Sequence, residues 1–422
     1  MRPVVHGWHL VWMSVPLRPK LRAVETIFVP DPAHGQVLVL RDTQGIAEGH
    51  AVLPPALVQI VARMTGASTC AEIAAEVQRE IKTKVPVAIV LDLARELDEA
   101  GFLEGETFEA RLLATKRAFS ESHTREASHA GAAYPNEPAA LTDYIQTKCI
   151  PREPKKRSHG RIVGLVSPHI DPWRGAAGYG RAYAALAAAA LPAEAETFVL
   201  LGTSHAPMRE PFSLTRKSYD TPLGPLDVDL DVIAKLERAA RFDPYYDELN
   251  HKREHSIEFQ AVFLKHALGD RAARVVPILA GLGEQQVSGE QPRLTDDVAR
   301  FVDALREIVN ERPGRVVVIA GADLAHVGPR FGDQAPDKKA LAAIEKTDRE
   351  SLAHATTRQS GDFWEHVAAD LDTRRVCGLA PIWTLLEALG PTSSASVLHY
   401  EQSIDSDDGS LVSHAAVGFY SG

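Results

Sequence analysis

The chain has 422 residues, 45% of them hydrophobic and 24% charged, which is the composition of a folded globular protein with about two or three domains. Its formal net charge of −10 argues against a general phosphate-binding surface, so nucleic acid is not an expected partner. The three cysteines, Cys70, Cys149 and Cys377, are widely separated and odd in number, which fits a reducing compartment better than a disulfide framework.

The chain begins with an apolar segment, VVHGWHLVWMSVPL, that is too short to span a membrane. It contains two histidines and lacks the basic region and small-residue cleavage site of a signal peptide. No run of about 20 apolar residues occurs elsewhere in the sequence. We therefore expect a cytoplasmic protein with no membrane partner.

Residues 1–119 have the pattern of a small, separate domain. The alternating stretches TIFVPD and QVLVLRD predict two short strands, and helical patterns follow over residues 56–66, 71–81 and 87–103. Thr69 and Glu72 have the spacing of a capping box at the start of the second helix. Two strands followed by three short helices indicate a winged-helix-like α+β domain.

This first domain resembles the PqqD-like peptide-chaperone domains that occur beside radical-SAM peptide-modifying enzymes. The stretches that carry the resemblance are RDTQGIAEGHAVLPPAL, GASTCAEIAAEV and LDEAGFLE. The resemblance implies docking of a peptide or of a radical-SAM partner protein. A DNA-binding winged helix is the alternative, but recognition helices are normally basic. The helices expected here are instead rich in acidic residues, which are Glu72, Glu76, Glu80, Asp92, Glu96, Asp98 and Glu99.

A polar stretch separates the first domain from the rest of the chain. The sequence SESHTREASHAG is rich in Ser, His and charged residues, and we expect a linker at about residues 120–125. The second domain, residues 120–422 including this linker, has a turn that leads into a helix at Pro138. No internal repeat or long low-complexity tract is visible.

The second domain alternates strand and helix patterns. Near-continuous apolar runs (RIVGLVS, TFVLLGTS, ARVVPILAGL and GRVVVIAGADL) are separated by helical stretches. This alternation predicts an α/β domain with a mixed, largely parallel sheet that is covered by helices on both faces.

Three histidines follow the ends of these predicted strands. The first strand leads to His169, the second leads to His205, and the fourth passes Asp323 and reaches His326. One histidine at a strand end is often simply solvated, but that explanation would have to hold three times. Because parallel strands bring their carboxyl ends to one edge of the sheet, we expect these side chains to share one site.

Cys377 comes just before a helix that Gly378 and Pro381 introduce. The free N–H groups and the dipole at a helix N-terminus lower the pKa of a thiol, and the neighbouring Arg374 and Arg375 would add to that effect. A buried, inert thiol is the alternative, because it is the commonest state of a cysteine in the cytoplasm.

A further histidine and carboxylate lie on the helix predicted over KREHSIEFQAVFLKHAL. His255 and Glu258 are three residues apart and share one helical face, while Ile257 and Leu264 line another. The pair would serve as partners of metal ligands, as acid and base, or as an exposed ion pair, and the exposed pair is the usual case on a surface helix.

Two imidazoles and one thiolate would form a fairly soft metal site that suits iron(II), copper or zinc and suits magnesium or calcium poorly. Asp323, His326, His255 and Glu258 would then orient the ligands or move protons. A metal-free Cys/His nucleophile needs the same proximity, so spacing alone does not separate the two alternatives. The sequence has no HExxH zinc-protease spacing, no GxSxG elbow and no phosphate-binding glycine loop.

From about Arg125 onward the chain resembles the Memo family, and among its members the bacterial proteins called AmmeMemoRadiSam system protein B. The matching motifs, in order, are SHAGAAYP, SPHID, LGTSHAP, EHSIEFQ, ADLAHVG, RVCGLAP and YEQSIDSDDGSLVSHAAVGFY. The resemblance implies the fold of class III non-haem iron-dependent extradiol dioxygenases. It places metal ligands at His169, His205 and Cys377, with Asp323 and His326 in the same pocket. Iron(II) is the metal that it implies first, with copper or zinc as alternatives.

One position departs from the family pattern. After His169 the family usually has a small Ala-Gly pair, whereas this chain has Ile170 and Asp171, and a carboxylate there would change the metal preference or the fit of a substrate. The first domain is also outside the usual Memo unit.

Two functions stay open. One is a metal-dependent redox protein, either an oxidoreductase or a dioxygenase-like enzyme, that works with a radical-SAM partner and a peptide. The other is a non-enzymatic peptide- or protein-binding scaffold that uses the same crevice. The substrate, the oxidation state of the metal and the oligomeric state do not follow from the sequence.

Overall fold

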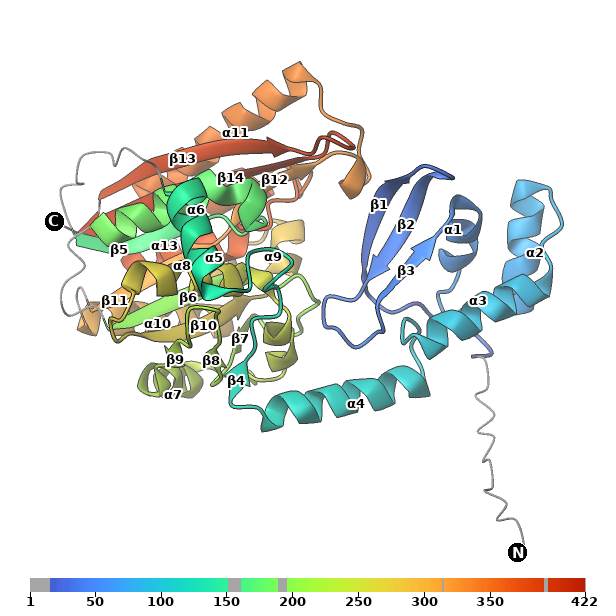
Figure 1. Ribbon diagram of the computed structural model, residues 1–422, viewed down its shortest axis with the longest axis horizontal. Coiled ribbons are helices and arrows are strands. Elements are labelled where there is room, and N and C mark those ends of the chain that lie inside the picture. The colour runs from blue at the N-terminus through green and yellow to red at the C-terminus, as the bar shows by residue number, and fades with distance from the viewer. Residues whose placement is uncertain (1–15, 151–160, 189–195, 313–314, 391–393, 422) are drawn as a thin grey trace, which may run out of the picture. The chain divides into compact units, whose positions relative to one another are not determined.

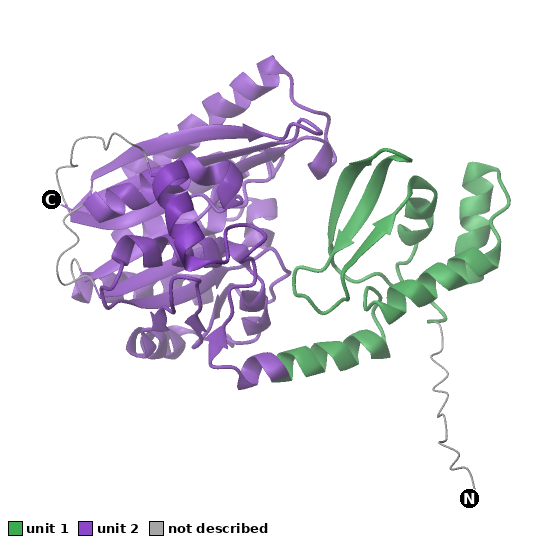
Figure 2. Cartoon of the chain, in the orientation of Figure 1, with its two compact units in different colours: residues 1–117 green, residues 118–422 purple. Residues whose placement is uncertain are grey.

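The computed structural model describes residues 16–150, 161–188, 196–312, 315–390 and 394–421. Nearly all of the apolar N-terminal segment lies outside these ranges. The chain forms two compact units, residues 1–117 (unit 1) and residues 118–422 (unit 2), as Figure 2 shows. The boundary expected from the sequence lies two residues further along the chain.

Unit 1 has an antiparallel three-stranded sheet followed by helices (Figure 1). The strands are β1 (Glu25–Asp31), β2 (Gly35–Arg41) and β3 (His50–Leu53), and the helices are α1 (Pro55–Val61), α2 (Cys70–Ile81), α3 (Val87–Glu99) and α4 (Glu106–Glu121). The expected strands and three helices are confirmed, and so is the capping box between Thr69 and Glu72. Sequence patterns missed β3 and α4. The unit has its own apolar core, in which Leu40, Ile73 and Val90 are fully buried.

Residues 120–125 do not form the expected linker. The helix α4 continues to Glu121, and Thr124–Arg125 form strand β4, which pairs in parallel with β8 (Ser218–Tyr219) of unit 2. Arg125 is completely buried. The polar composition of this stretch was misleading because the guanidinium of Arg125 pairs with a buried carboxylate inside the domain instead of with solvent.

Unit 2 is built on one mixed sheet that contains nine of the described strands. Its central strands β5 (Arg161–Ser167), β11 (Val316–Gly321), β6 (Thr197–Thr203) and β10 (Arg274–Ala280) are parallel neighbours in that order. The outer strands run mainly antiparallel and are β12 (Asp323–Val327), β13 (Ser394–Ile404), β14 (Leu411–Ser421) and β7 (Phe212–Leu214), while β9 (Asp227–Val228) pairs in parallel with β10. The expected mixed, largely parallel sheet is confirmed.

Helices cover both faces of this sheet (Figure 1). Two of them, α6 (Pro172–Ala188) and α8 (His255–Leu268), pack on one face, and α13 (Leu379–Leu389) packs on the other with α10 (Asp296–Glu311) against it. The remaining helices are α5 (Pro138–Tyr144), α7 (Leu230–Ala239), α9 (Gly283–Ser288), α11 (Lys338–Thr357) and α12 (Ser360–Ala368).

At the carboxyl end of β6, the helices on both faces of the sheet come close to the strand. A Cβ on Gly202 would lie 2.6 Å from the Ile257 side chain of α8, so only glycine lets this helix approach. The next residue points to the opposite face, as successive strand residues do, and the Thr203 hydroxyl donates a 2.7 Å hydrogen bond to the carbonyl of Cys377 before α13. The carboxyl end of β6 therefore contacts α8 on one face of the sheet and the turn before α13 on the other.

Candidate metal centre

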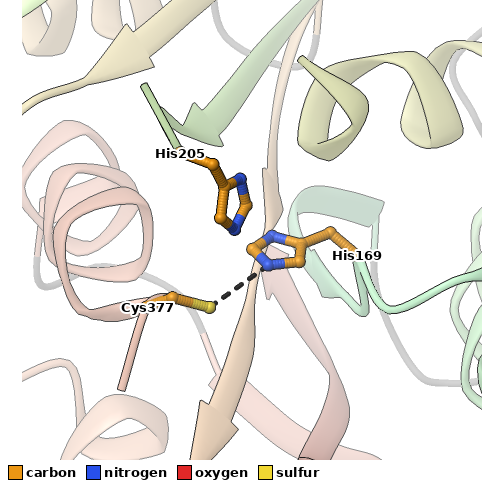
Figure 3. Close-up of side chains that lie close together, drawn as sticks. All are labelled: His169, His205 and Cys377. Atoms are coloured by element: carbon orange, nitrogen blue, oxygen red, sulfur yellow. Dashed lines mark hydrogen bonds between the residues drawn. The ribbon is translucent and has the colours of Figure 1, made fainter. Parts of the chain in front are cut away.

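The structure brings together the three residues for which the sequence indicated metal ligands (Figure 3). His169 follows β5 and His205 follows β6, at the carboxyl ends of parallel strands on either side of β11. Cys377 lies just before α13. One ligand atom of each residue lies within 4.8 Å of the others, and the Cys377 Sγ is 3.2 Å from the His169 Nε2.

The ring of His169 is held in one orientation by backbone and carboxylate groups. Its Nδ1 lies 2.9 Å from the carbonyl oxygen of Gly321, which can only accept, so Nδ1 carries the proton and Nε2 points toward the sulfur. The Asp323 carboxylate accepts a 2.9 Å hydrogen bond from the His169 backbone N–H. The Asp323 carbonyl also accepts the Gly378 N–H at 3.0 Å, so this residue joins the turns that carry His169 and Cys377.

His205 is oriented by Glu254, a residue that sequence reasoning missed. The carboxylate of Glu254 accepts the His205 backbone N–H at 2.8 Å and lies 2.9 Å from the ring Nδ1. The Glu254 side chain is only 4% exposed and caps α8 by accepting the Ser256 N–H. The predicted helix began at Lys252 and so included Glu254, whereas the observed helix begins at His255 with Glu254 as its N-cap.

Electrostatics keep Glu254 ionised. Burial acts to raise the pKa of its carboxyl group, but the charge of His205 and the hydrogen bond from that ring outweigh it and hold the pKa well below its usual range. Because an ionised carboxylate only accepts, the His205 Nδ1 carries a proton. The other nitrogen of the ring is hydrogen-bonded to Cys377 and is the atom that would serve as a ligand.

His255 lies beside the cluster but is not paired with Glu258. Its ring stacks on the ring of His205, with centroids 4.5 Å apart and an interplanar angle of 22°. Its Nδ1 is 3.3 Å from Glu254. Burial and the nearby charge of His205 hold the pKa of His255 well below its usual range. Of the three alternatives for His255 and Glu258, the exposed ion pair is wrong, because most of α8 is buried between the sheet and its neighbours.

Glu258 is fully buried and binds a different set of groups. Its carboxylate pairs with Arg125, accepts a 2.5 Å hydrogen bond from the Tyr134 hydroxyl and accepts the His129 N–H at 2.9 Å. Burial acts to raise the pKa of this carboxyl group, but Arg125 and His129 lower it far below its usual range. Glu258 therefore anchors residues 125–134 to α8. The His129 ring of this anchored segment lies edge-on to the ring of His255, with centroids 5.8 Å apart.

Cys377 is a thiolate at neutral pH in this environment. Burial acts to raise its pKa, but the positive charges of His169 and His326 and hydrogen bonds from His169 and His205 lower it to about 5. Burial likewise opposes protonation of His169, but Cys377 and Asp323 raise the pKa of that imidazole to about 9. The imidazolium and the thiolate therefore stabilise each other in the metal-free site.

The two arginines expected to activate Cys377 are engaged elsewhere. Arg374 pairs with the buried Asp348 at 3.0 Å and with Asp370 at 2.6 Å, and Arg375 pairs with Asp333 at 2.6 Å. Both guanidinium groups hold the turn before Cys377 in place. The lowered pKa of the thiol comes instead from the histidines.

His326 is close enough for its charge to act on Cys377, but it is not part of the three-residue cluster. Its backbone N–H donates a 2.7 Å hydrogen bond to the carbonyl of Arg374, and its Nδ1 lies 3.1 Å from the carbonyl of Arg375. The residue therefore joins the end of β12 to the turn that carries Cys377.

Asp171 does not join the cluster either. Its carboxylate accepts the Arg174 backbone N–H at 3.1 Å and pairs with the Arg174 Nε at 2.6 Å, so it caps the start of α6. The expectation that this residue adds a carboxylate to the metal site has no support in this arrangement.

The fold and the site define a class: an α/β protein in which two oriented imidazoles and an activated thiolate meet at the carboxyl edge of a parallel sheet. Residues 125–418 match the family model described as Memo-like protein, and the chain belongs to this family. The match covers most of unit 2 and begins at the buried Arg125.

Proteins of several organisms are similar in sequence to this chain. A MEMO1 family protein of Aquifex aeolicus is 27% identical over 406 residues, which cover 96% of this chain and 100% of the relative. A MEMO1 family protein of Thermus thermophilus is 32% identical, and the alignment covers 59% of this chain and 68% of the relative. A memo-1 homolog of Caenorhabditis elegans is 28% identical, and the alignment covers 70% of this chain and 82% of the relative. The Aquifex alignment is longer than unit 2 and therefore also includes most of unit 1.

No helix among the described residues combines the length and apolar character that crossing a membrane requires.

Proposed function

We propose that this chain is a metal-binding redox protein in which His169, His205 and Cys377 hold iron(II) or copper. Zinc fits the same donors but would supply no redox chemistry. One observation carries the proposal: a ligand atom from each residue lies within 4.8 Å of the others, and the second nitrogen of both rings is already engaged. Such outer hydrogen bonds fix the tautomer and direction of metal-binding histidines.

The donor set fits these metals. Two imidazoles and a thiolate suit iron(II), copper and zinc, and three protein ligands leave a position for a substrate. Because the pKa of Cys377 is about 5, the thiolate is present at neutral pH without a metal. A bound metal would supply redox chemistry or polarise a substrate at the open position. Its binding would release the protons that the metal-free histidines carry.

The residues around the cluster fix the orientation of its side chains and determine which ring nitrogens carry protons. Glu254 and the Gly321 carbonyl keep the proton on the Nδ1 of each ring. Asp323 fixes the separation of the two turns that bear His169 and Cys377. His255 stacks on His205, and its lowered pKa keeps it neutral, so it packs against the ligand ring without adding a second positive charge.

The test is metal analysis of protein purified without oxygen. We expect about one equivalent of iron or copper in the wild type and a large loss in His169→Ala, His205→Ala and Cys377→Ser. His399→Ala, a histidine on β13 outside the cluster, should keep the wild-type metal content. Equal metal content in all five proteins would contradict the proposal. It would favour the alternative function, a non-enzymatic peptide- or protein-binding scaffold that uses the same crevice.

We also propose that unit 1 docks a radical-SAM partner protein or its peptide. Support comes from the acidic helices of this unit, which disfavour nucleic acid, and from its presence beside the Memo-like unit in the Aquifex relative. Deletion of residues 1–117 should abolish co-purification with a radical-SAM partner and leave the metal content of unit 2 unchanged. Retained binding by the truncated chain would contradict the docking role.

A further inference from the structure

The three-stranded sheet of unit 1 carries apolar side chains on both of its faces. The inner face presents Leu38, Leu40 and Leu53 to the apolar core of the unit, and α1 packs on β2 and β3 (Figure 1). An antiparallel sheet that packs on a core with one face normally has polar residues on the other face. β2 departs from this pattern, because Val37 and Val39 alternate with its leucines.

The outer face of this sheet consists of two cross-strand rows of branched aliphatic side chains. One row joins Ile27, Val39 and Val52, and the other joins Val29 and Val37. None of these five side chains belongs to the core that the described residues of unit 1 form. Val29 and Val52 are 38% and 58% exposed. Covering the outer face would therefore lower the free energy of the unit by removing apolar surface from water.

The outer face is too small to hold a second copy of the chain by itself. A stable interface buries about 800 Å² on each partner, from roughly 20 to 30 residues. Only five side chains make up the outer face, and Val37 is already buried. A segment of the same chain needs much less contact, because a short tether gives it an effective concentration in the millimolar range. The size of the outer face therefore favours a tethered occupant.

The N-terminal segment of the chain, residues 3–15, has the composition of such an occupant. Its sequence, PVVHGWHLVWMSV, contains no acidic residue, lysine or arginine and includes Trp8, Leu10 and Trp12. The segment lies outside the described residues, which begin at its end with Pro16. Exposure of this much apolar surface to water is unfavourable, so contact with another apolar surface would stabilise the segment.

The length and the attachment point of the segment let it reach the outer face. The Leu21 N–H donates a 2.7 Å hydrogen bond to the carbonyl of Met64, and β1 begins four residues later at Glu25. When extended, residues 3–15 span roughly 45 Å, because each residue adds at most about 3.4 Å. The seven residues of β1 span only about 24 Å. The segment is therefore long enough to cross the outer face.

We propose that residues 3–15 cover the outer face of the unit 1 sheet and bury their apolar side chains against Ile27, Val29, Val39 and Val52. The inference goes beyond the proposed function, because the contact needs neither a metal nor a partner protein. It explains why an apolar segment and an apolar sheet face occur together in one small unit.

The test measures how fast a cysteine on the outer face reacts with N-ethylmaleimide in the full chain and in a chain that lacks residues 2–15. The reporter is Val29→Cys. The control is Thr26→Cys, at an exposed position of the same strand whose side chain lies on the opposite face. The thiolate sulfur adds to one carbon of the maleimide double bond, and the other carbon takes up a proton. Digestion and mass spectrometry follow each cysteine separately.

Removal of residues 2–15 should raise the labelling rate at Val29→Cys roughly tenfold, which is the protection lost if the effective concentration of the segment is about ten times its dissociation constant. The rate at Thr26→Cys should stay the same in both chains. An unchanged rate at Val29→Cys would overturn the proposal. Protection that weakens when the full chain is diluted would also overturn it, because a second copy would then be the cover.

Two further variants test the contact without shortening the chain. Val52→Lys places a charge at the most exposed position of the outer face, and Trp8→Ser combined with Trp12→Ser removes the two largest side chains of the segment. Each should raise the labelling rate of Val29→Cys as the deletion does. His6→Asn keeps every apolar side chain of the segment and should leave the rate low. Slow labelling in both test variants would contradict the assigned contact.

A native cysteine separates loss of the cover from unfolding of unit 1. Cys70 is buried in the core of this unit and should stay unlabelled in the deletion and in every variant. If Cys70 instead reacts as fast as Val29→Cys, the whole unit has opened, and the proposal that the segment covers one face of a folded sheet is wrong.

Discussion

At the scale of single residues, the ionisation of Cys377 decides what the site can bind. The pKa of the thiol is lowered to about 5, chiefly because the charges of His169 and His326 outweigh its burial. In metal-free protein we therefore expect the rate of alkylation by iodoacetamide to rise with pH through an inflection near 5. His169→Gln removes a positive charge, so the inflection should move to higher pH. A wild-type inflection at the ordinary thiol value would contradict this assignment.

Glu254 is the residue on which the orientation of His205 depends. Glu254→Gln removes the charge that holds the proton on the His205 Nδ1 and leaves a side chain of the same size. We expect the metal affinity to fall by about 10- to 100-fold, which is the usual effect of losing such a partner, with the fold retained. Competition with a chelator of known affinity measures the change. Glu248→Gln is the matched control, since Glu248 bonds to Thr215 and not to a cluster histidine.

At the scale of elements, the close approach of β12 to the start of α13 fixes the place of Cys377. A Cβ on Gly378 would lie 2.3 Å from the carbonyl oxygen of Asp323, closer than real Cβ atoms come to backbone. Gly378→Ala should therefore displace the turn and abolish metal binding, while circular dichroism still shows a folded sheet. Gly283→Ala, where an added Cβ meets nothing within 4 Å, should bind metal like the wild type. Full metal occupancy in Gly378→Ala would show that this approach does not position the cysteine.

The elements also show which features of the site a sequence pattern can predict. The positions of His169 and His205 were predictable, because parallel strands end at a common edge and each histidine follows its own strand. The role of Glu254 as the partner of His205 was not predictable, because the two residues are 49 positions apart and the local sequence pattern of neither depends on their hydrogen bond. The pairing of Arg125 with Glu258 spans 133 residues, so a stretch that looked like a polar linker became a buried part of the domain. Tertiary partners, and not local propensity, decided these cases.

At the scale of the whole molecule, the two units have separate cores, and all of the candidate ligands lie in unit 2. A core that is complete within one unit does not need the other unit to be stable. We therefore expect residues 118–422 alone to fold and to hold the same amount of metal per chain as the full protein. Circular dichroism, thermal unfolding and metal analysis of the truncated chain provide the measurement.

The same experiment separates two roles for unit 1. If unit 1 only docks a partner, its removal changes partner binding and leaves the metal content and the midpoint of thermal unfolding of unit 2 close to their full-length values. If unit 1 instead completes the fold of unit 2, the truncated chain should unfold at a clearly lower temperature. Cys377→Ser in the truncated chain is the control, because metal that persists in it is not held by the cluster. A truncated chain that folds but binds no metal would contradict the location of the site within unit 2.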